Sequence, residues 1–274
     1  MVQLMKFSVL ISSYCKDVPA ELALALKSIW DDQTVKPSEI VIVKDGPLTE
    51  ELDSVIDGFA QTAPVKIVPL PENRGLGLAL AEGITHCTFD YIARMDSDDI
   101  SLPDRFERQV AFMEQNPDIS ICGGMIQEFC GSPDNITSKR TLPQTDAEIR
   151  HFCKWRSPFN HMTVMYRKQA VIEAGNYQHF LSYEDYWLWA RLLKNGCKTA
   201  NLPDILVDVR AGQGMLVRRK GWRFFTAEIA LAWKLYAIGI INFPEMMRNI
   251  LFRATVRLMP GWLLGKLYAL FCRK

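Results

Sequence analysis

Three carboxylates stand close together in the sequence, at Asp96, Asp98 and Asp99, directly after an apolar run typical of a buried strand. An Asp-x-Asp pair at the end of a strand suits Mg²⁺ or Mn²⁺, because these hard cations prefer oxygen ligands and keep open positions for a substrate diphosphate. The residues that follow are expected to open a helix, with Ser101 as its cap and Pro103 near its first turn. The alternative for the carboxylates is that Asp98 and Asp99 only favour the N-terminus of that helix. On the first interpretation, this strand-to-helix loop binds a metal ion.

Two other polar turns follow strands of the same expected sheet. Asp45 ends the second apolar run, and Arg74 lies in an Asn-Arg-Gly turn after the third. Since the carboxyl ends of parallel strands meet at one edge of a sheet, both turns should converge on the three carboxylates. Asp45 would then accept hydrogen bonds from a base or ribose, and Arg74 would hold a base or phosphate with its planar donor fork. Taken singly, each is also explained by ordinary turn chemistry.

A second acidic pair, Glu184 and Asp185, precedes an apolar stretch that predicts a helix over residues 183–194. A carboxylate held there among aromatic neighbours is suited to accept a proton from a hydroxyl group. The alternative is an ordinary acidic first turn, which the helix dipole favours. His161 is a candidate for binding an acceptor or acting near the metal, although a lone histidine more often has a structural role.

The elements that must position these residues alternate between strands and helices. Such alternation is typical of right-handed β-α-β units and a parallel sheet. We therefore predict an α/β fold with a Rossmann-like nucleotide-binding half over residues 1–100. Its strands are expected at 7–13, 39–44, 65–69 and 89–95, and its helices at 21–30, 49–59 and 76–84.

The next segment, residues 101–215, has a less regular pattern and is expected to complete the same domain as its second half, which the resemblance described below makes the acceptor half. Gly212-Gln-Gly214 is typical of a hinge, so a tail is expected from residue 216 to residue 274. Within the acceptor half we expect helices at 105–115 and 183–194, strands at 119–129, 162–166, 198–200 and 205–209, and a surface loop at 131–145.

Composition limits the class of protein. With 274 residues, 49% of them hydrophobic, the chain can bury a substantial core and is neither disordered nor fibrous. Its seven cysteines include no Cys-x-x-Cys pair, so we expect reduced thiols in a cytosolic setting rather than disulfides or a zinc site. The N-terminal residues do not resemble a cleaved signal.

The tail differs in charge from the rest of the chain. Residues 216–274 carry eleven Lys or Arg against two acids, a net charge of +9, whereas the remainder carries −8. Its stretches 224–241 and 250–271 are apolar and aromatic but interrupted by cations, so we expect amphipathic helices at an anionic membrane surface rather than membrane spans. The alternative is a helical appendage packed on the body or in a dimer. No nucleic-acid partner is expected.

The order of these features resembles the inverting family 2 glycosyltransferases of the GT-A fold, especially the amylovoran-type enzymes of bacterial O-antigen, capsule and exopolysaccharide synthesis. Five motifs in a fixed order are far more specific than any one of them. The resemblance spans residues 6–214, and the motifs read Ser8-Val-Leu-Ile-Ser-Ser-Tyr14, Lys44-Asp-Gly46, Asn73-Arg-Gly75, Asp96-Ser-Asp-Asp99 and Glu184-Asp185-Tyr-Trp-Leu-Trp.

The resemblance implies a role for each matching residue. Asp98 and Asp96 would bind Mn²⁺ or Mg²⁺, and Asp96 would also face the ribose. Asp185 would be the general base, with Glu184 beside it. The expected donor-binding residues are Ser13, Tyr14, Asp45, Arg74, Asp96 and Arg210, and the expected acceptor-binding residue is His161.

One departure concerns the segment after Asp185. The Gln-x-x-Arg-Trp signature of the family's processive synthases is absent from the sequence, which favours the addition of a single sugar. A basic segment stands in its place, in which Arg210, Arg218 and Arg219 would clamp the diphosphate of the donor or of the acceptor. For Arg218 and Arg219 a solvated basic turn explains the sequence equally well.

The resemblance thus implies a metal-dependent enzyme that moves one hexose, Gal or Glc, from a UDP-sugar to an N-acetylhexosamine on a polyprenyl diphosphate. It would be cytoplasmic and peripheral on the inner face of the cell membrane. One alternative is a sugar-nucleotidyltransferase, but residues 12–17 lack the glycine-rich loop that this class needs. Another is a non-catalytic nucleotide-sugar-binding scaffold, and the presence of Asp98 and Asp185 counts against it.

Overall fold

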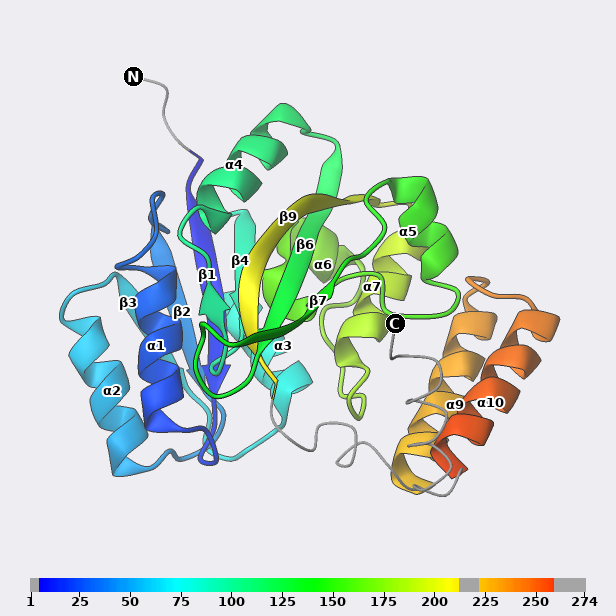
Figure 1. Cartoon of the computed structure of the whole chain (residues 1–274), viewed down its shortest axis with the longest axis horizontal. Coiled ribbons are helices and arrows are strands. Elements are labelled where there is room, and N and C mark those ends of the chain that lie inside the picture. Colours follow the sequence, from blue (N-terminus) through cyan, green and yellow to red (C-terminus); the bar gives the residue numbers. More distant parts are fainter. Residues whose placement is uncertain (1–4, 212–221, 259–274) are drawn as a thin grey trace. The chain divides into compact units, whose positions relative to one another are not determined.

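The computed structural model describes residues 5–211 and 222–258 (Figure 1). The chain divides into two compact units, Met1–Gly212 and Gln213–Lys274. The expected hinge at 212–214 and the two arginines Arg218 and Arg219 lie outside the described residues.

The first unit begins with four parallel strands joined by helices, as the sequence predicts. The strand order is β3-β2-β1-β4, and Ile11 of β1 lies opposite Ile42 of β2 and Met95 of β4. The elements are β1 (Phe7–Ser13), α1 (Pro19–Ile29), β2 (Glu39–Lys44), α2 (Glu50–Ala60), β3 (Val65–Pro69), α3 (Leu76–His86) and β4 (Tyr91–Met95).

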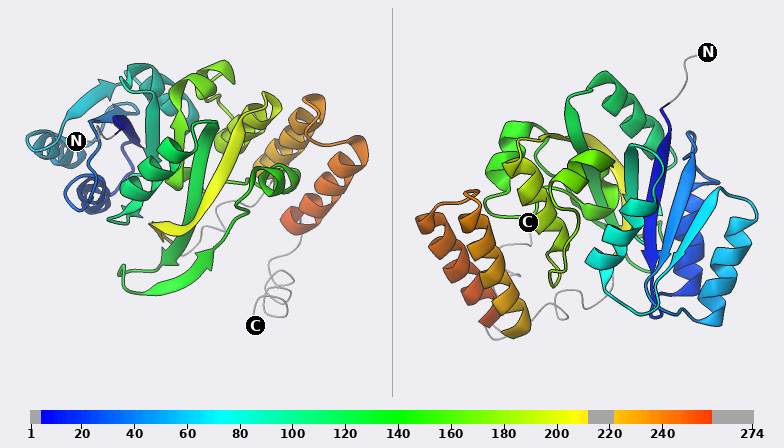
Figure 2. Two further views of the ribbon diagram at one scale, coloured as in Figure 1. Left: turned by 90° about the horizontal axis from the view of Figure 1, so that it is seen from above. Right: turned by 180° about the vertical axis from the view of Figure 1, so that it is seen from behind.

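These strands are apolar on both faces, which is why helices pack on each face. Val9 and Ile11 belong to the core that also contains Leu22 of α1. Leu10 points to the opposite face, because successive side chains of a strand alternate. A Cβ built on Gly83 of α3 would lie only 2.5 Å from Leu10 Cδ1, so α3 approaches the sheet through a residue without a side chain. Helices α1 and α2 therefore cover one face and α3 covers the other (Figure 2).

The second half of the unit continues the same sheet with mixed strand directions. Beyond β4, the order is β8-β6-β9-β5, with β7 paired to β6. The pairs are antiparallel except for β6 with β9. These elements are β5 (Ile100–Ser101), α4 (Arg105–Gln115), β6 (Ile119–Phe129), β7 (Ile136–Arg140), α5 (Asp146–Phe152), the 3₁₀ turn η1 (His161–Thr163), β8 (Met165–Arg167), α6 (Lys168–Glu173), α7 (Glu184–Lys194) and β9 (Lys198–Arg210).

The helix α4 has the predicted bounds, Arg105–Gln115, but the segment before it differs from the sequence prediction. Ser101 does not cap this helix, because it lies in β5 and its backbone N–H donates to Ser28 Oγ at 3.0 Å. The helix begins only at Arg105, and Gln33 Nε2 holds the intervening segment by donating to the Leu102 carbonyl at 2.8 Å. Partners distant in sequence thus replace the predicted local cap.

Three other segments also differ from the predictions. The surface loop expected at 131–145 contains the exposed strand β7, which pairs with β6. The strand expected at 162–166 starts as η1 and continues as β8. The two strand pieces expected at 198–200 and 205–209 form one continuous strand, β9.

The described part of the second unit consists of two helices, α9 (Trp222–Ala237) and α10 (Phe243–Leu258). They contact each other, and Arg253 Nη1 lies 3.1 Å from Glu228 Oε1, which is only 4% exposed. The expected helices at 224–241 and 250–271 correspond to these two, shifted toward the N-terminus, with residues 259–274 outside the described part. Among the described residues, the helices are too short or too polar to cross a membrane.

Candidate functional site

The parallel strands bring the predicted donor-binding residues to one edge of the sheet. Ser13 lies at the end of β1 opposite Lys44 of β2, so Asp45 follows at the same level. Ile11 lies opposite Met95, the last residue of β4, so the acidic loop begins beside the end of β1. Asp45, Ser13 and Asp96 therefore emerge at the same edge, as the sequence predicts.

The three carboxylates of the acidic loop form a compact cluster. Asp96, Asp98 and Asp99 each offer an oxygen within 4.8 Å of the others, and they range from exposed to buried. Although Asp98 is the exposed member of the three, loss of hydration around its carboxylate, and after it the negative charge of Asp96, raises its pKa to about 6. Burial and both neighbouring carboxylates raise the pKa of Asp99 well above its ordinary value. Oxygen ligands that repel each other at this spacing fit a divalent cation.

Arg210, at the end of β9, contacts the same loop. Its backbone N–H donates to Asp99 Oδ1 at 2.9 Å, and its Nε donates to the Asp98 carbonyl at 3.3 Å. The guanidinium also lies 3.1 Å from Glu21 Oε1 and stacks 4.8 Å above the centre of the Phe129 ring. The far end of the sheet therefore supports the acidic loop directly.

Asp45 holds the turn that contains Arg74 through two hydrogen bonds. Its two carboxylate oxygens accept the backbone N–H groups of Arg74 at 2.7 Å and of Gly75 at 3.0 Å. The neighbouring Gly46 has a φ of +85°, and a Cβ there would lie 2.6 Å from Asn73 N. Arg74 itself is exposed, with Nη1 4.0 Å from Glu82 Oε2. The turn interpretation and the donor-binding interpretation of these residues are thus compatible.

The loop after β1 contains a carboxylate that the sequence reasoning missed. Asp17 Oδ2 accepts the N–H of Tyr14 at 3.3 Å, and Tyr14 exposes its ring. Burial raises the pKa of Asp17, and the negative charge of Asp96 raises it further. Its position a few residues after the first strand was the available sequence clue, because that loop borders the same sheet edge.

The second predicted acidic pair begins α7. Asp185 Oδ2 lies 3.5 Å from Ser157 Oγ, and both acids stand in the first turn of the helix. A Cβ on Gly77, at the start of α3, would lie 3.1 Å from Glu184 Cβ. The N-terminus of α7 therefore packs against the helix that follows the Arg74 turn, which brings the predicted base close to the donor edge.

His161 lies in a polar and aromatic cluster. Its Nε2 is 2.8 Å from the Tyr177 hydroxyl, and its ring centre is 5.8 Å from that of Trp189, which is four residues after Asp185. Burial, and then the charge of Arg94, lowers the pKa of His161 well below its ordinary value, so the ring is neutral at pH 7. The contact with Trp189 places His161 beside α7, the helix that begins with Glu184 and Asp185.

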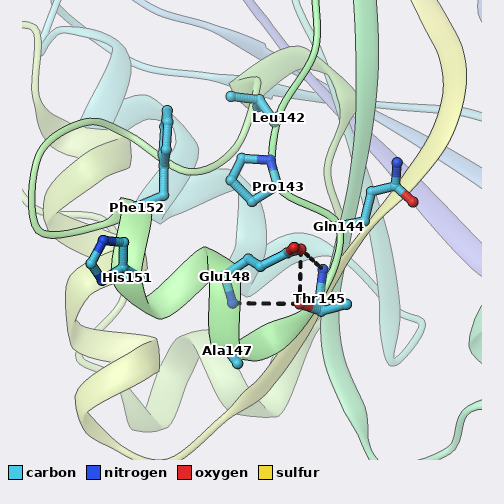
Figure 3. Close-up of a pocket in the computed structure, with 8 residues that line it drawn as sticks. All are labelled: Leu142, Pro143, Gln144, Thr145, Ala147, Glu148, His151 and Phe152. Carbon is cyan, nitrogen blue, oxygen red and sulfur yellow. Dashed lines mark hydrogen bonds between the residues drawn. The ribbon is translucent and has the colours of Figure 1, made fainter.

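A pocket lies away from these residues, along the start of α5 (Figure 3). It has a volume of about 770 Å³, and none of the predicted site residues lines it. Two of its lining residues, Thr145 and Glu148, form a reciprocal cap at the start of α5, in which Thr145 N donates to Glu148 Oε2 at 3.2 Å. The lining residues are Leu142, Pro143, Gln144, Thr145, Ala147, Glu148, His151 and Phe152.

Comparison with known proteins identifies close relatives. The model of the family "Glycosyl transferase family 2" matches residues 8–175. The amylovoran biosynthesis glycosyltransferase AmsE of Erwinia amylovora is 42% identical over 262 residues, which cover 96% of this chain and 97% of the relative. The Escherichia coli protein named UDP-Gal:alpha-D-GlcNAc-diphosphoundecaprenol beta-1,3-galactosyltransferase is 37% identical over 269 residues, which cover 98% and 97%.

Solved structures resemble the chain in fold. Staphylococcus aureus TarS 1–349, in complex with UDP-GlcNAc, gives a TM-score of 0.66 at 17% identity, with 92% of this chain and 73% of that chain covered. The mannosyltransferase PcManGT from Pyrobaculum calidifontis, in complex with GDP-Man and Mn²⁺, gives 0.62 at 17% identity, with 98% and 74% covered. The predicted α/β fold of the GT-A type is confirmed.

Proposed function

The chain belongs to the family 2 glycosyltransferases, and on that premise we propose that it adds one hexose to a polyprenyl-diphosphate-linked saccharide in bacterial surface polysaccharide synthesis. The donor would be a UDP-sugar. The activity for which the E. coli relative is named supports galactose as the sugar and an N-acetylhexosamine as the acceptor. The observation that carries the proposal is the cluster of Asp96, Asp98 and Asp99 at the carboxyl edge of the sheet.

The donor is proposed to bind across this edge. Ser13 and Tyr14 would line the nucleotide pocket, and Asp45 would hold the nucleoside while it fastens the Arg74 turn. Arg74 would lie near the base or diphosphate. Arg210 would contribute from the acceptor half, where its contacts with Asp98 and Asp99 already place it beside the acidic loop.

The metal is proposed to be Mn²⁺ or Mg²⁺, held by Asp98 and Asp96. When bound, such a cation neutralises the charge that develops on the leaving nucleoside diphosphate. The protein's part is to present carboxylate oxygens at the right spacing, and their spread of no more than 4.8 Å supports this role.

Asp185 is proposed as the general base, with Glu184 beside it. It would take the proton of the acceptor hydroxyl as that oxygen attacks the anomeric carbon from the face opposite the diphosphate, which inverts the configuration. His161 would contact the acceptor. Its neighbour Trp189, on the same helix as Asp185, supports a place for it on that side of the site.

The tail, residues 216–274, is proposed to associate with an anionic membrane at the cytoplasmic face, whereas residues 1–215 would form the catalytic domain. Aromatic side chains prefer the headgroup region, and cations are attracted to anionic lipid. The described helices expose seven large apolar side chains, and they are Trp222, Trp233, Tyr236, Phe243, Met247, Leu251 and Phe252.

One experiment tests the proposed function. The purified protein is incubated with Mn²⁺, a panel of nucleotide sugars and a synthetic lipid-diphosphate N-acetylhexosamine, and the product is identified by mass spectrometry and NMR. We expect one added hexose and release of UDP. Binding of a nucleotide sugar without turnover would favour a scaffold, and formation of a nucleotide sugar from UTP and a sugar phosphate would favour a nucleotidyltransferase.

A further inference from the structure

Arg94 is a charged residue inside the buried strand β4, two positions before Asp96. Since side chains two apart on a strand point to the same face, the sequence places both on one side of the sheet. The structure joins them in an ion pair between Arg94 Nη2 and Asp96 Oδ1. The Arg94 side chain is 1% exposed and that of Asp96 is 26% exposed, so the pair runs from the interior to the surface of the site.

The guanidinium of Arg94 uses only one of its three nitrogens in the ion pair with Asp96. Among the described residues, Arg94 Nε and Nη1 have no hydrogen-bond partner, and both are buried. Of the three guanidinium nitrogens, Nη2 is therefore the one with a polar contact among the described residues, and this contact is with Asp96. A buried charge that loses its partner is costly, so the attraction fixes the position of Asp96 as much as that of Arg94.

A second buried guanidinium lies behind the first. Arg105 of α4 is completely buried, and its Nη2 donates to the Arg94 carbonyl at 2.7 Å. Its Nε donates to Gln109 Oε1 at 3.0 Å, and no carboxylate pairs with it among the described residues. Arg105 is thus matched to Arg94 in residue type, burial and location, but it does not hold an acid of the cluster.

On its other side, Arg94 faces the acceptor part of the site. Its positive charge acts on His161 and Tyr177, which are joined by the 2.8 Å contact between His161 Nε2 and the Tyr177 hydroxyl. Tyr177 is in turn under the influence of Asp185 and Glu184. Arg94 is therefore joined to the acidic loop by an ion pair, and its charge acts on His161 and Tyr177 as well.

We propose that Arg94 is a positioning residue of the donor site: it holds Asp96 Oδ1 on the protein side and leaves Oδ2 to face the cation and the donor. The proposal rests on the proposed function. Three carboxylates repel each other, and a fixed guanidinium on one of them keeps the cluster assembled before a cation arrives. Arginine suits this role because its donor fork fixes the orientation of a carboxylate, which the point charge of lysine does not.

The test compares Arg94→Lys with the matched control Arg105→Lys, since both substitutions keep a buried charge and remove the fork. Folding is checked by circular dichroism, and Mn²⁺-dependent UDP binding is measured by calorimetry. We expect Arg94→Lys to weaken UDP binding by about 10- to 100-fold, the usual effect of removing a partner behind a metal ligand. The donor KM should rise with it, whereas the acceptor KM should hold. Arg105→Lys should bind UDP like the wild type.

The same substitution in an Asp96→Asn background shows whether Arg94 acts through Asp96. If it does, Arg94→Lys causes no further loss of UDP binding there. Should Arg94→Lys fail to fold, Arg94→Gln takes its place under the same criteria. Unchanged UDP binding in Arg94→Lys, or equal losses with and without the Asp96 carboxylate, would overturn the positioning role alone. A wild-type protein that binds no nucleoside diphosphate with Mn²⁺ would refute the proposed function, and this inference with it.

Discussion

Gly46 follows Asp45 at the donor edge, and the structure gives a magnitude for replacing it with alanine. Its φ is +85°, where a residue with a side chain loses roughly 1–2 kcal/mol. The new Cβ would also lie 2.6 Å from Asn73 N, a backbone atom that cannot rotate away. Forcing the two segments apart adds about 1–3 kcal/mol, as overpacking does elsewhere. We expect Gly46→Ala to lower the unfolding free energy by about 2–5 kcal/mol in total.

Two other glycines separate these contributions. Gly75 has a φ of +83° and a ψ of 156°, a combination that only glycine adopts readily, but nothing lies within 4 Å of a Cβ there, so Gly75→Ala should cost only the roughly 1–3 kcal/mol of the backbone conformation. Gly58 lies within helix α2 and also has open space around a Cβ. Gly58→Ala should therefore stabilise the protein by about 0.5–1 kcal/mol, because alanine is the better helix former.

The three variants are compared by urea unfolding with linear extrapolation at equal slopes. UDP binding with Mn²⁺ is measured in parallel. Because Asn73 adjoins the turn that Asp45 holds, Gly46→Ala should weaken UDP binding as well as lower stability. Gly58→Ala should weaken neither UDP binding nor stability. A loss of stability at Gly46 no larger than that at Gly75 would mean that the close contact with Asn73 is absent, and the reasoning would be refuted.

Four further outcomes are expected. Asp98→Ala should abolish transfer and the Mn²⁺ dependence of UDP binding while the fold survives, and full activity of the wild type in EDTA would contradict this. Asp185→Asn should slow turnover by about 10²-fold or more, the usual size of general-base loss, with UDP-sugar affinity nearly unchanged; an equal loss of affinity would make Asp185 a donor ligand. Loss of hydration raises the folded-state pKa of Asp98 from 3.8 to about 6, so ionising this carboxyl destabilises the folded protein. In EDTA, the wild type should therefore lose stability relative to Asp98→Asn as the pH rises from about 3.8 to about 6. A difference in Tm that stays constant with pH would contradict the shift. Deleting the residues after Leu216 should release the protein from phosphatidylglycerol vesicles at low salt; a full-length protein that ignores such vesicles would contradict the membrane role.

The fold of the first half was predictable because its information is local. Continuous apolar runs such as residues 39–44 have the length and bounds of buried strands, and polar turns separate them from the helices. The same locality revealed the acidic cluster, since Asp96, Asp98 and Asp99 are adjacent in sequence as well as in space. Parallel strand direction then brought Asp45 to the same edge.

What the sequence did not reveal depends on partners far along the chain. Ser101 has the residue type of a helix cap, but β9 pairs with it through Val207 and changes its role. Strand β7 is mostly polar and all five of its residues are exposed, so it has no alternating apolar pattern, and only its pairing with β6 defines it. The sequence held one clue in β4 that was not used, namely Arg94. A cation within a buried strand requires a partner, and Asp96, two residues later, lies on the same face of the sheet as Arg94.

The two hydrogen bonds from the Arg74 turn to Asp45 also bear on how the protein can be engineered. The chain between them, residues 46–73, leaves the sheet edge to form α2 and β3 and returns to within 2.7 Å of its starting point. Closing a loop costs little more when the loop is longer, so length changes at the exposed turn near Gln61 should leave the donor edge in place. That turn is therefore a suitable position for inserting a fluorescent or affinity module that reports on the enzyme without entering its site.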